Sequence, residues 1–194
     1  NKYTKGGDDY FRFYGNPLPI AFVLKNGEKK EIDVEPGTKE DPIRYNIAEI
    51  LPNSWNFVGA ECDRSFILTT NSVEEVSVES GETTICNFYN EKNGTLKIVN
   101  QNLSFLTAGE TAHYAVLPTP IYESITANGQ QGSEGSIHEL RPANYAINQK
   151  VQLDWKLDSV ECNGLSVPIV KNQIIATVAP GQLTTCIFKN KLVE

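Results

Sequence analysis

The chain has 194 residues, of which 40% are hydrophobic and 9% aromatic, and a formal net charge of −7. The acidic balance argues against a nucleic-acid partner or an anionic membrane surface. No apolar run is long enough to cross a bilayer, so we expect no membrane insertion of this segment. The length suits two domains of ordinary size, each with its own core.

Short segments in which apolar and polar residues alternate follow one another along the chain. In the first half they are 45–50, 55–58, 76–78 and 84–89, and in the second half 145–147, 155–157, 176–178 and 185–188. Turn-forming pairs such as Asn26-Gly27, Ser80-Gly81 and Asn163-Gly164 separate them, and no convincing amphipathic helix is present. Many short strands with regular turns predict an all-β protein with an antiparallel β-sandwich in each half.

The second half repeats the first at an offset of one hundred residues, without a gap. We therefore predict two tandem domains, residues 1–92 and 93–194, joined by a short polar junction that limits their relative freedom. The identical pairs are Pro42/Pro142, Tyr45/Tyr145, Ile47/Ile147, Trp55/Trp155, Glu61/Glu161, Val78/Val178, Gly81/Gly181, Thr84/Thr184, Phe88/Phe188 and Asn90/Asn190.

Four cysteines form two matched pairs, Cys62 with Cys86 and Cys162 with Cys186, and the separation within each pair is 24 positions. Matched pairs are typical of an oxidising compartment. Because no C-x-x-C motif or histidine cluster accompanies them, we favour one disulfide in each domain over free thiols or a metal site. We expect no metal and no cofactor, and a secreted or cell-surface location.

A recognisable set of motifs runs from residue 45 to residue 90: Tyr-x-Ile-x-Glu, Leu-Pro-x-x-Trp, Glu-Cys and Ser-Gly-Glu-Thr-Thr-x-Cys-x-Phe-x-Asn. Residues 145–190 keep most of them, and Gly94-Thr-Leu-Lys-Ile-Val resembles the opening strand of such a repeat. Together these motifs resemble the prealbumin-like, Cna protein B-type (SpaA-like) repeats of bacterial surface and pilus proteins. The resemblance implies compact, Ig-like antiparallel sandwiches used in adhesins, pilus shafts and stalks, without one fixed ligand.

Some members of this family join a lysine of the first strand to an asparagine of the last, assisted by a glutamate across the sheet. The resemblance places the asparagine at Asn90 and the glutamate at Glu49, with Lys2 as a possible nucleophile. Burial would favour the neutral amine and the protonated carboxyl that such an isopeptide needs. The alternative is that Asn90 caps backbone groups at a strand end and that Glu49 is solvated or paired with a surface lysine. In the second domain Gln149 and Asn100 replace the glutamate and the lysine, so we expect no isopeptide there.

Two tripeptides match the acceptor sequence for N-glycosylation, at Asn93 and at Asn102. Chance is the favoured explanation for both.

The first strand of the first domain is hard to place. Thr95 lies fifty positions before Tyr145, and the same offset before Tyr45 falls ahead of Asn1, while residues 1–5 lack clear alternation. Three interpretations remain open: the domain uses these early residues with shorter loops, the chain has been trimmed, or the open edge takes a strand from another chain.

The combined pattern predicts a non-enzymatic, extracellular structural subunit of a cell-surface filament, pilus or stalk. Such a subunit would self-associate end to end into a polymer, with donor-strand exchange as one mode of assembly, or would bind other surface proteins. The alternative is an adhesin-type module that recognises a host protein or glycan through residues 101–140, where the two halves diverge. No nucleophile elbow, phosphate loop or zinc-helix motif is present, so we expect no enzymatic activity.

Overall fold

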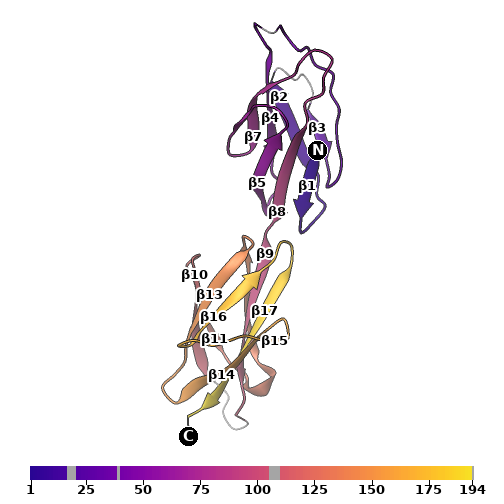
Figure 1. Cartoon of the computed structure of the whole chain (residues 1–194). Coiled ribbons are helices and arrows are strands. Elements are labelled where there is room, and N and C mark those ends of the chain that lie inside the picture. The colour runs from indigo at the N-terminus through magenta and orange to yellow at the C-terminus, as the bar shows by residue number, and fades with distance from the viewer. Residues whose placement is uncertain (17–20, 39, 105–109, 194) are drawn as a thin grey trace. The chain divides into compact units, whose positions relative to one another are not determined.

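The computed structural model describes residues 1–16, 21–38, 40–104 and 110–193. These residues form β-strands and one short 3-10 turn, η1 (Gly129–Gln131), and none of them belongs to a helix long and apolar enough to cross a membrane. The structure divides into two compact units, Asn1–Lys92 (unit 1) and Asn93–Glu194 (unit 2), and each contains two sheets (Figure 1). The predicted all-β class is confirmed.

The described part of unit 1 forms one sheet of three strands, in the order β1-β8-β5, and one of five, in the order β3-β2-β4-β7-β6. The strands are β1 (Lys2–Lys5), β2 (Phe11–Asn16), β3 (Phe22–Leu24), β4 (Arg44–Ile50), β5 (Trp55–Cys62), β6 (Ile67–Leu68), β7 (Ser72–Ser77) and β8 (Cys86–Lys92).

The described part of unit 2 forms one sheet of four strands, in the order β11-β10-β13-β16, and one of five, in the order β12-β9-β17-β14-β15. The strands are β9 (Gly94–Asn102), β10 (Thr111–Leu117), β11 (Ile121–Thr126), β12 (Ser133–Leu140), β13 (Ala143–Lys150), β14 (Trp155–Cys162), β15 (Leu165–Ser166), β16 (Gln173–Val178) and β17 (Leu183–Leu192).

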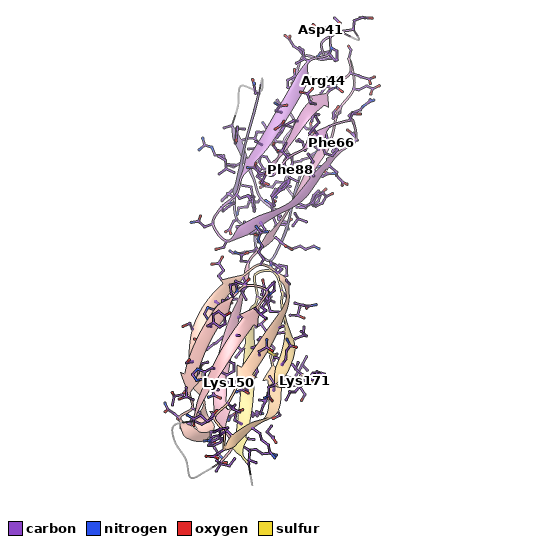
Figure 2. All side chains as sticks on the ribbon, turned by 90° about the vertical axis from the view of Figure 1, so that its left-hand side faces the viewer. Asp41, Arg44, Phe66, Phe88, Lys150 and Lys171 are labelled. Carbon is purple, nitrogen blue, oxygen red and sulfur yellow. A yellow bond between two sulfur atoms is a disulfide. The ribbon has the colours of Figure 1, made fainter. Side chains whose placement is uncertain are left out.

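Each core lies between the two sheets of its unit, because the inward side chains of alternating strands meet there. In unit 1 the core is rich in aromatic residues: Phe13 stacks on Phe22 and meets Phe88 edge-on, with ring centroids 5.2 and 5.1 Å apart. Phe88 lies in the interior of this unit (Figure 2). In unit 2 aliphatic residues such as Leu96 and Ile98 take a larger share of the core, and both are fully buried.

The chain itself supplies the first strand of unit 1. Lys2–Lys5 form β1, which pairs in parallel with β8 so that Lys2 lies opposite Phe88 and Thr4 opposite Asn90. The hypothesis that this edge accepts its strand from another chain is therefore wrong for these four residues. The pairing is also parallel rather than antiparallel, because the long intervening chain crosses between the sheets and no tight turn dictates the direction.

The last strands of the two units pair with their neighbours in corresponding registers. Trp55 lies opposite Lys92 and Trp155 opposite Leu192, and in both pairs a register shift follows within two residues. The parallel pair of the first and last strands also recurs, since β9 pairs with β17 and places Asn100 opposite Phe188. Asn100 therefore holds in unit 2 the register position that Lys2 holds in unit 1.

Candidate functional site

Lys2 is a buried lysine on the first strand of unit 1, and its side chain is 0% exposed. Its Nζ lies 4.2 Å from the ring centroid of Phe11 and donates to the backbone oxygen of Tyr3 at 3.4 Å. A lysine is almost never fully buried unless another group compensates its charge. The position of Lys2 therefore requires a partner inside the sandwich.

Glu49 supplies that partner from β4, in the opposite sheet. It is also 0% exposed, and its Oε1 lies 3.0 Å from Lys2 Nζ. Asn71 fixes the backbone of Glu49: its carbonyl accepts from the Glu49 N–H at 2.9 Å, and its Nδ2 donates to the Glu49 carbonyl at 2.6 Å. Within the described residues, however, neither carboxyl oxygen takes part in a hydrogen bond of ordinary geometry. The contact with Lys2 is thus close but poorly aligned, which makes it a weak source of stability.

Asn90, on β8, is the third residue of this buried group, and it is 2% exposed. Asn90 lies two residues after Phe88, which is opposite Lys2 in the strand pair. The long side chain of Lys2 can therefore reach Asn90. Its amide is close enough to Glu49 to oppose the rise in the pKa of that carboxyl, although neither amide atom has an aligned hydrogen-bond partner among the described residues. A buried amide left in this state costs about 1–3 kcal/mol. The alternative roles, a capping Asn90 and a solvated Glu49, find no support in this geometry.

Burial shifts both ionisable groups of this cluster toward their neutral forms. Desolvation lowers the pKa of the Lys2 amine, and the nearby Glu49 only partly offsets it. Desolvation likewise raises the pKa of the Glu49 carboxyl, against the opposing effects of Lys2 and Asn90. The cluster therefore favours a neutral amine beside a protonated carboxyl and a primary amide. These are the nucleophile, the acid and the electrophile that amide exchange requires.

Unit 2 holds a different polar group in the same place. Asn190 donates through Nδ2 to Asn100 Oδ1 at 2.7 Å, and Asn100 donates to the backbone oxygen of Ile125 at 2.9 Å and to Glu110 Oε2 at 3.2 Å. Gln149 donates to the hydroxyl of Tyr114 at 2.9 Å. The side-chain N–H groups of Asn100, Asn190 and Gln149 thus have partners inside the unit, and none of these residues is an amine nucleophile.

Sequence reasoning missed Glu110 and Tyr114 as members of this second cluster. Glu110 is 2% exposed, and burial raises the pKa of its carboxyl, with Asn100 and Asn190 opposing the rise. The signal that could have found both residues is the period of two: Glu110 directly precedes β10 and continues the buried alternation of Ala112 and Tyr114.

The four cysteines are joined in two disulfides, Cys62–Cys86 and Cys162–Cys186, each across a separation of 24 residues. The first bond joins β5 to β8 and the second joins β14 to β17, at matching register positions. Such a bond restricts the unfolded chain and stabilises the unit by about 3 kcal/mol in the chain-entropy model.

The two glycosylation candidates lie in different surroundings. Asn93 donates through Nδ2 to Glu139 Oε1 at 2.8 Å and is partly exposed. Asn102 is fully buried, and its Oδ1 accepts from the backbone N–H of Ser104 at 2.8 Å. The folded unit leaves no room for a glycan on Asn102. Of the divergent face at residues 101–140, residues 105–109 lie outside the described part of the chain.

No protein-family model and no curated protein matches this chain. Among solved structures it is similar to the major pilin of Streptococcus pyogenes, at 11% identity and a TM-score of 0.36, covering 100% of this chain and 97% of the pilin. It is similar to an adhesin from Mobiluncus mulieris that contains intramolecular disulfide, isopeptide and ester bond cross-links, at 10% identity and a TM-score of 0.39, covering 98% and 87% of the two chains.

A third similar structure is the pilus adhesin SpaC from Lactobacillus rhamnosus GG, at 12% identity and a TM-score of 0.35. The match covers 100% of this chain but only 31% of the adhesin. These structural neighbours are pilins and adhesins. At such low identities and TM-scores, however, the likeness alone assigns no activity or partner to this chain.

Proposed function

We propose that the chain is an extracellular structural subunit of a cell-surface filament, pilus or stalk, and that unit 1 is closed by an amide bond between Lys2 and Asn90. The observation that carries this proposal is the buried group of Lys2, Glu49 and Asn90. Lys2 and Glu49 are both 0% exposed, and neither the Glu49 carboxyl nor the Asn90 amide has an aligned hydrogen-bond partner among the described residues. A cluster that only stabilised the fold would be expected to satisfy its polar atoms.

The bond forms by amide exchange. The neutral Lys2 Nζ attacks Cγ of Asn90 while the protonated Glu49 donates a hydrogen bond to Oδ1, where negative charge develops. The bond from Cγ to Nδ2 then breaks, and the proton lost by Lys2 passes through Glu49 to the leaving nitrogen. The products are one new amide between the two side chains and one molecule of ammonia, so no oxidant or co-reactant is required.

The position of the bond suits a mechanical role. Lys2 lies at the start of unit 1, and Asn90 lies at its end, shortly before Asn93 begins unit 2. Tension applied through the two ends would pass along the short covalent path through the Lys2 and Asn90 side chains. The hydrogen-bonded strands between these residues would then carry little load.

Intact mass tests the proposal directly. The expected mass of the purified chain is that of the sequence with two disulfides, reduced by one molecule of ammonia. Lys2→Met, Glu49→Gln and Asn90→Ala are each expected to restore the missing ammonia, apart from the mass of the substitution itself. Asn190→Ala, at the matching position of unit 2, serves as the control and leaves the deficit unchanged. A wild-type chain with its full calculated mass would overturn the cross-link.

A second candidate function is a binding module, and exposed apolar side chains of unit 2 favour it. Tyr122 on β11 is 76% exposed and Ile137 on β12 is 61% exposed, and both belong to the segment that departs from the repeat. Exposed aromatic and apolar side chains are frequent anchors at protein interfaces. A glycan and host-protein array probed with the chain and with Tyr122→Ala tests this role. Ligand binding that the substitution leaves unchanged would argue against this surface.

A further inference from the structure

Glu110 carries a carboxyl that is buried in unit 2 directly before β10, and the residue is 2% exposed. Its backbone carbonyl accepts from the N–H of Ala127 at 2.7 Å, and Ala127 is 0% exposed. The pairing of β10 with β11 therefore continues through Glu110, and the alternation that buries Ala112 and Tyr114 turns its side chain inward. The proposed cross-link of unit 1 makes no use of this carboxyl.

Amides and a phenol surround the Glu110 carboxyl. From β9, Asn100 donates to Glu110 Oε2 at 3.2 Å. From β17, Asn190 lies close enough for its amide to stabilise the ionised form of the carboxyl. Tyr114 on β10 and Gln149 on β13 complete the cluster, joined by a hydrogen bond of 2.9 Å. Among the described residues of this cluster, Tyr114 is the titratable neighbour of Glu110, and a neutral phenol supplies no positive charge.

No basic side chain of the described residues forms an ion pair with Glu110. On β10 and β13, His113 bonds to Ser124 at 2.7 Å and Lys150 is exposed. Residues 105–109, which lie outside the described part of the chain, contain no lysine, arginine or histidine. A buried carboxylate without a cation is costly, and such a group keeps its proton instead. The cations of the other neighbouring strands pair elsewhere, as Lys97–Glu134, His138–Glu123, Lys189–Glu161 and Lys191–Asp158.

The cluster around Glu110 is also short of hydrogen-bond donors. Among the described residues of unit 2, the buried side-chain atoms without a hydrogen-bond partner are all oxygens, and they belong to Glu110 (Oε1), Ser133, Gln149 and Asn190. Asn100 already donates twice, to Glu110 and to the backbone oxygen of residue 125. An ionised carboxyl can only accept hydrogen bonds, whereas a protonated one also donates. A proton on Glu110 therefore supplies the kind of group that the unpartnered oxygens lack.

We propose that Glu110 is protonated in folded unit 2 and acts as a pH-sensitive lock, so that the packing of β10 against β9 and β17 weakens as the pH rises. Desolvation supports this role, because it raises the pKa of the Glu110 carboxyl, and the opposing effects of Asn100 and Asn190 are smaller. In the unfolded chain the same carboxyl loses its proton near pH 4.5. The stability that the proton provides is therefore complete below this pH and is lost as the pH rises through the folded pKa. The lock is independent of the Lys2–Asn90 bond and of filament assembly.

The pH dependence of unfolding tests the lock. Each unit contains one tryptophan, Trp55 or Trp155, so 5-fluorotryptophan reports the urea unfolding of each unit separately by fluorine NMR. From about pH 4.5 upward, the equilibrium constant for unfolding of unit 2 is expected to rise by up to about tenfold per pH unit, until the folded pKa is passed. Glu110→Gln keeps the shape of the side chain but cannot titrate, so this rise should be lost. Glu134→Gln on β12, where the side chain is 66% exposed, is the matched control and should retain it.

A second measurement on the wild-type chain does not depend on the folding of any variant. With carbon-13 at the glutamate carboxyls, the NMR signal of Glu110 is expected to titrate with a midpoint above 4.5. A midpoint at or below 4.5 would overturn the proposal, and so would an equal pH dependence in the wild type and Glu110→Gln. A loss of unit 2 stability on addition of EDTA would also overturn it, because a bound cation would then neutralise the carboxylate. Intact mass of the same samples reports the cross-link of unit 1 separately.

Discussion

Units 1 and 2 have the same strand pairing around their last strands, but they differ in the polar group that each buries between its sheets. Lys2 and Asn100 hold the same register position, opposite Phe88 and Phe188. In unit 2 Asn190, the equivalent of Asn90, donates through Nδ2 to Asn100 Oδ1, while in unit 1 neither amide atom of Asn90 has an aligned partner among the described residues. The same fold can therefore bury either linked amides or a lysine beside a carboxyl and an amide. The two clusters differ at two positions, where Lys2 and Glu49 of unit 1 correspond to Asn100 and Gln149 of unit 2.

The largest expected effect comes from removing the nucleophile of unit 1. Lys2→Met prevents the proposed bond to Asn90, which would close a loop of 88 positions (90 − 2). The chain-entropy model assigns such a closure about 4–5 kcal/mol, so the unfolding transition of unit 1 is expected to fall by about 20 °C. Scanning calorimetry measures this shift. Lys5→Met, at an exposed position on the same strand, is the control. A comparable shift in both variants would contradict a cross-link.

The two disulfides are expected to contribute unequally to the stability of the two units. Replacing Cys162 and Cys186 by alanine is expected to destabilise unit 2 by about 3 kcal/mol, because the unfolded chain gains freedom. The same change at Cys62 and Cys86 should cost less, since the proposed bond from Lys2 to Asn90 would already enclose that loop. Denaturant unfolding of the two double variants gives both losses. Equal losses would indicate that no second tie exists in unit 1.

The pH dependence of unit 1 should change when Lys2 is lost. In Lys2→Met, Glu49 remains buried, and desolvation raises the pKa of its carboxyl above the ordinary value of 4.5. The folded state then retains a proton that the unfolded state releases. Its stability should therefore fall as the pH rises through 4.5, by up to about 1.4 kcal/mol per pH unit until the folded pKa is passed.

Urea unfolding between about pH 4 and pH 7 measures this slope, over the range in which an ordinary carboxyl loses its proton. The double variant Lys2→Met/Glu49→Gln is the matched control and should lack this contribution. A slope that is the same in both variants would show that Glu49 does not titrate with folding.

The smallest expected effect concerns the amide network of unit 2. Tyr114→Phe removes the hydroxyl that accepts from Gln149 Nε2 at 2.9 Å and leaves that buried donor without its partner. We expect a loss of about 1–2 kcal/mol, confined to the transition of unit 2. Gln149→Leu in the Tyr114→Phe background tests the cause, because removal of the donor as well should recover part of the loss. A larger penalty in the double variant would contradict this explanation.

The features that depend on local pattern could be predicted from the sequence. Alternating segments such as 45–50 and 84–89 indicated strands of the correct parity. Glu49 and Asn90 were identified through the resemblance of residues 45–90 to the repeat family, and both lie on inward faces. The equal separations of the cysteines indicated the two pairs that the structure joins. Period and spacing are short-range properties, and one chain is enough to display them.

The pairing of the first and last strands of unit 1 could not be predicted from the sequence. Residues 1–5 have no clear apolar alternation because their inward residue is Lys2, whose burial depends on Glu49 in the opposite sheet. The parallel pairing of β1 with β8 joins strands more than eighty residues apart, and no local signal encodes such a pairing. The place of Glu110 follows from the same cause. It is set by which distant strands come together, and this depends on the packing of the whole unit.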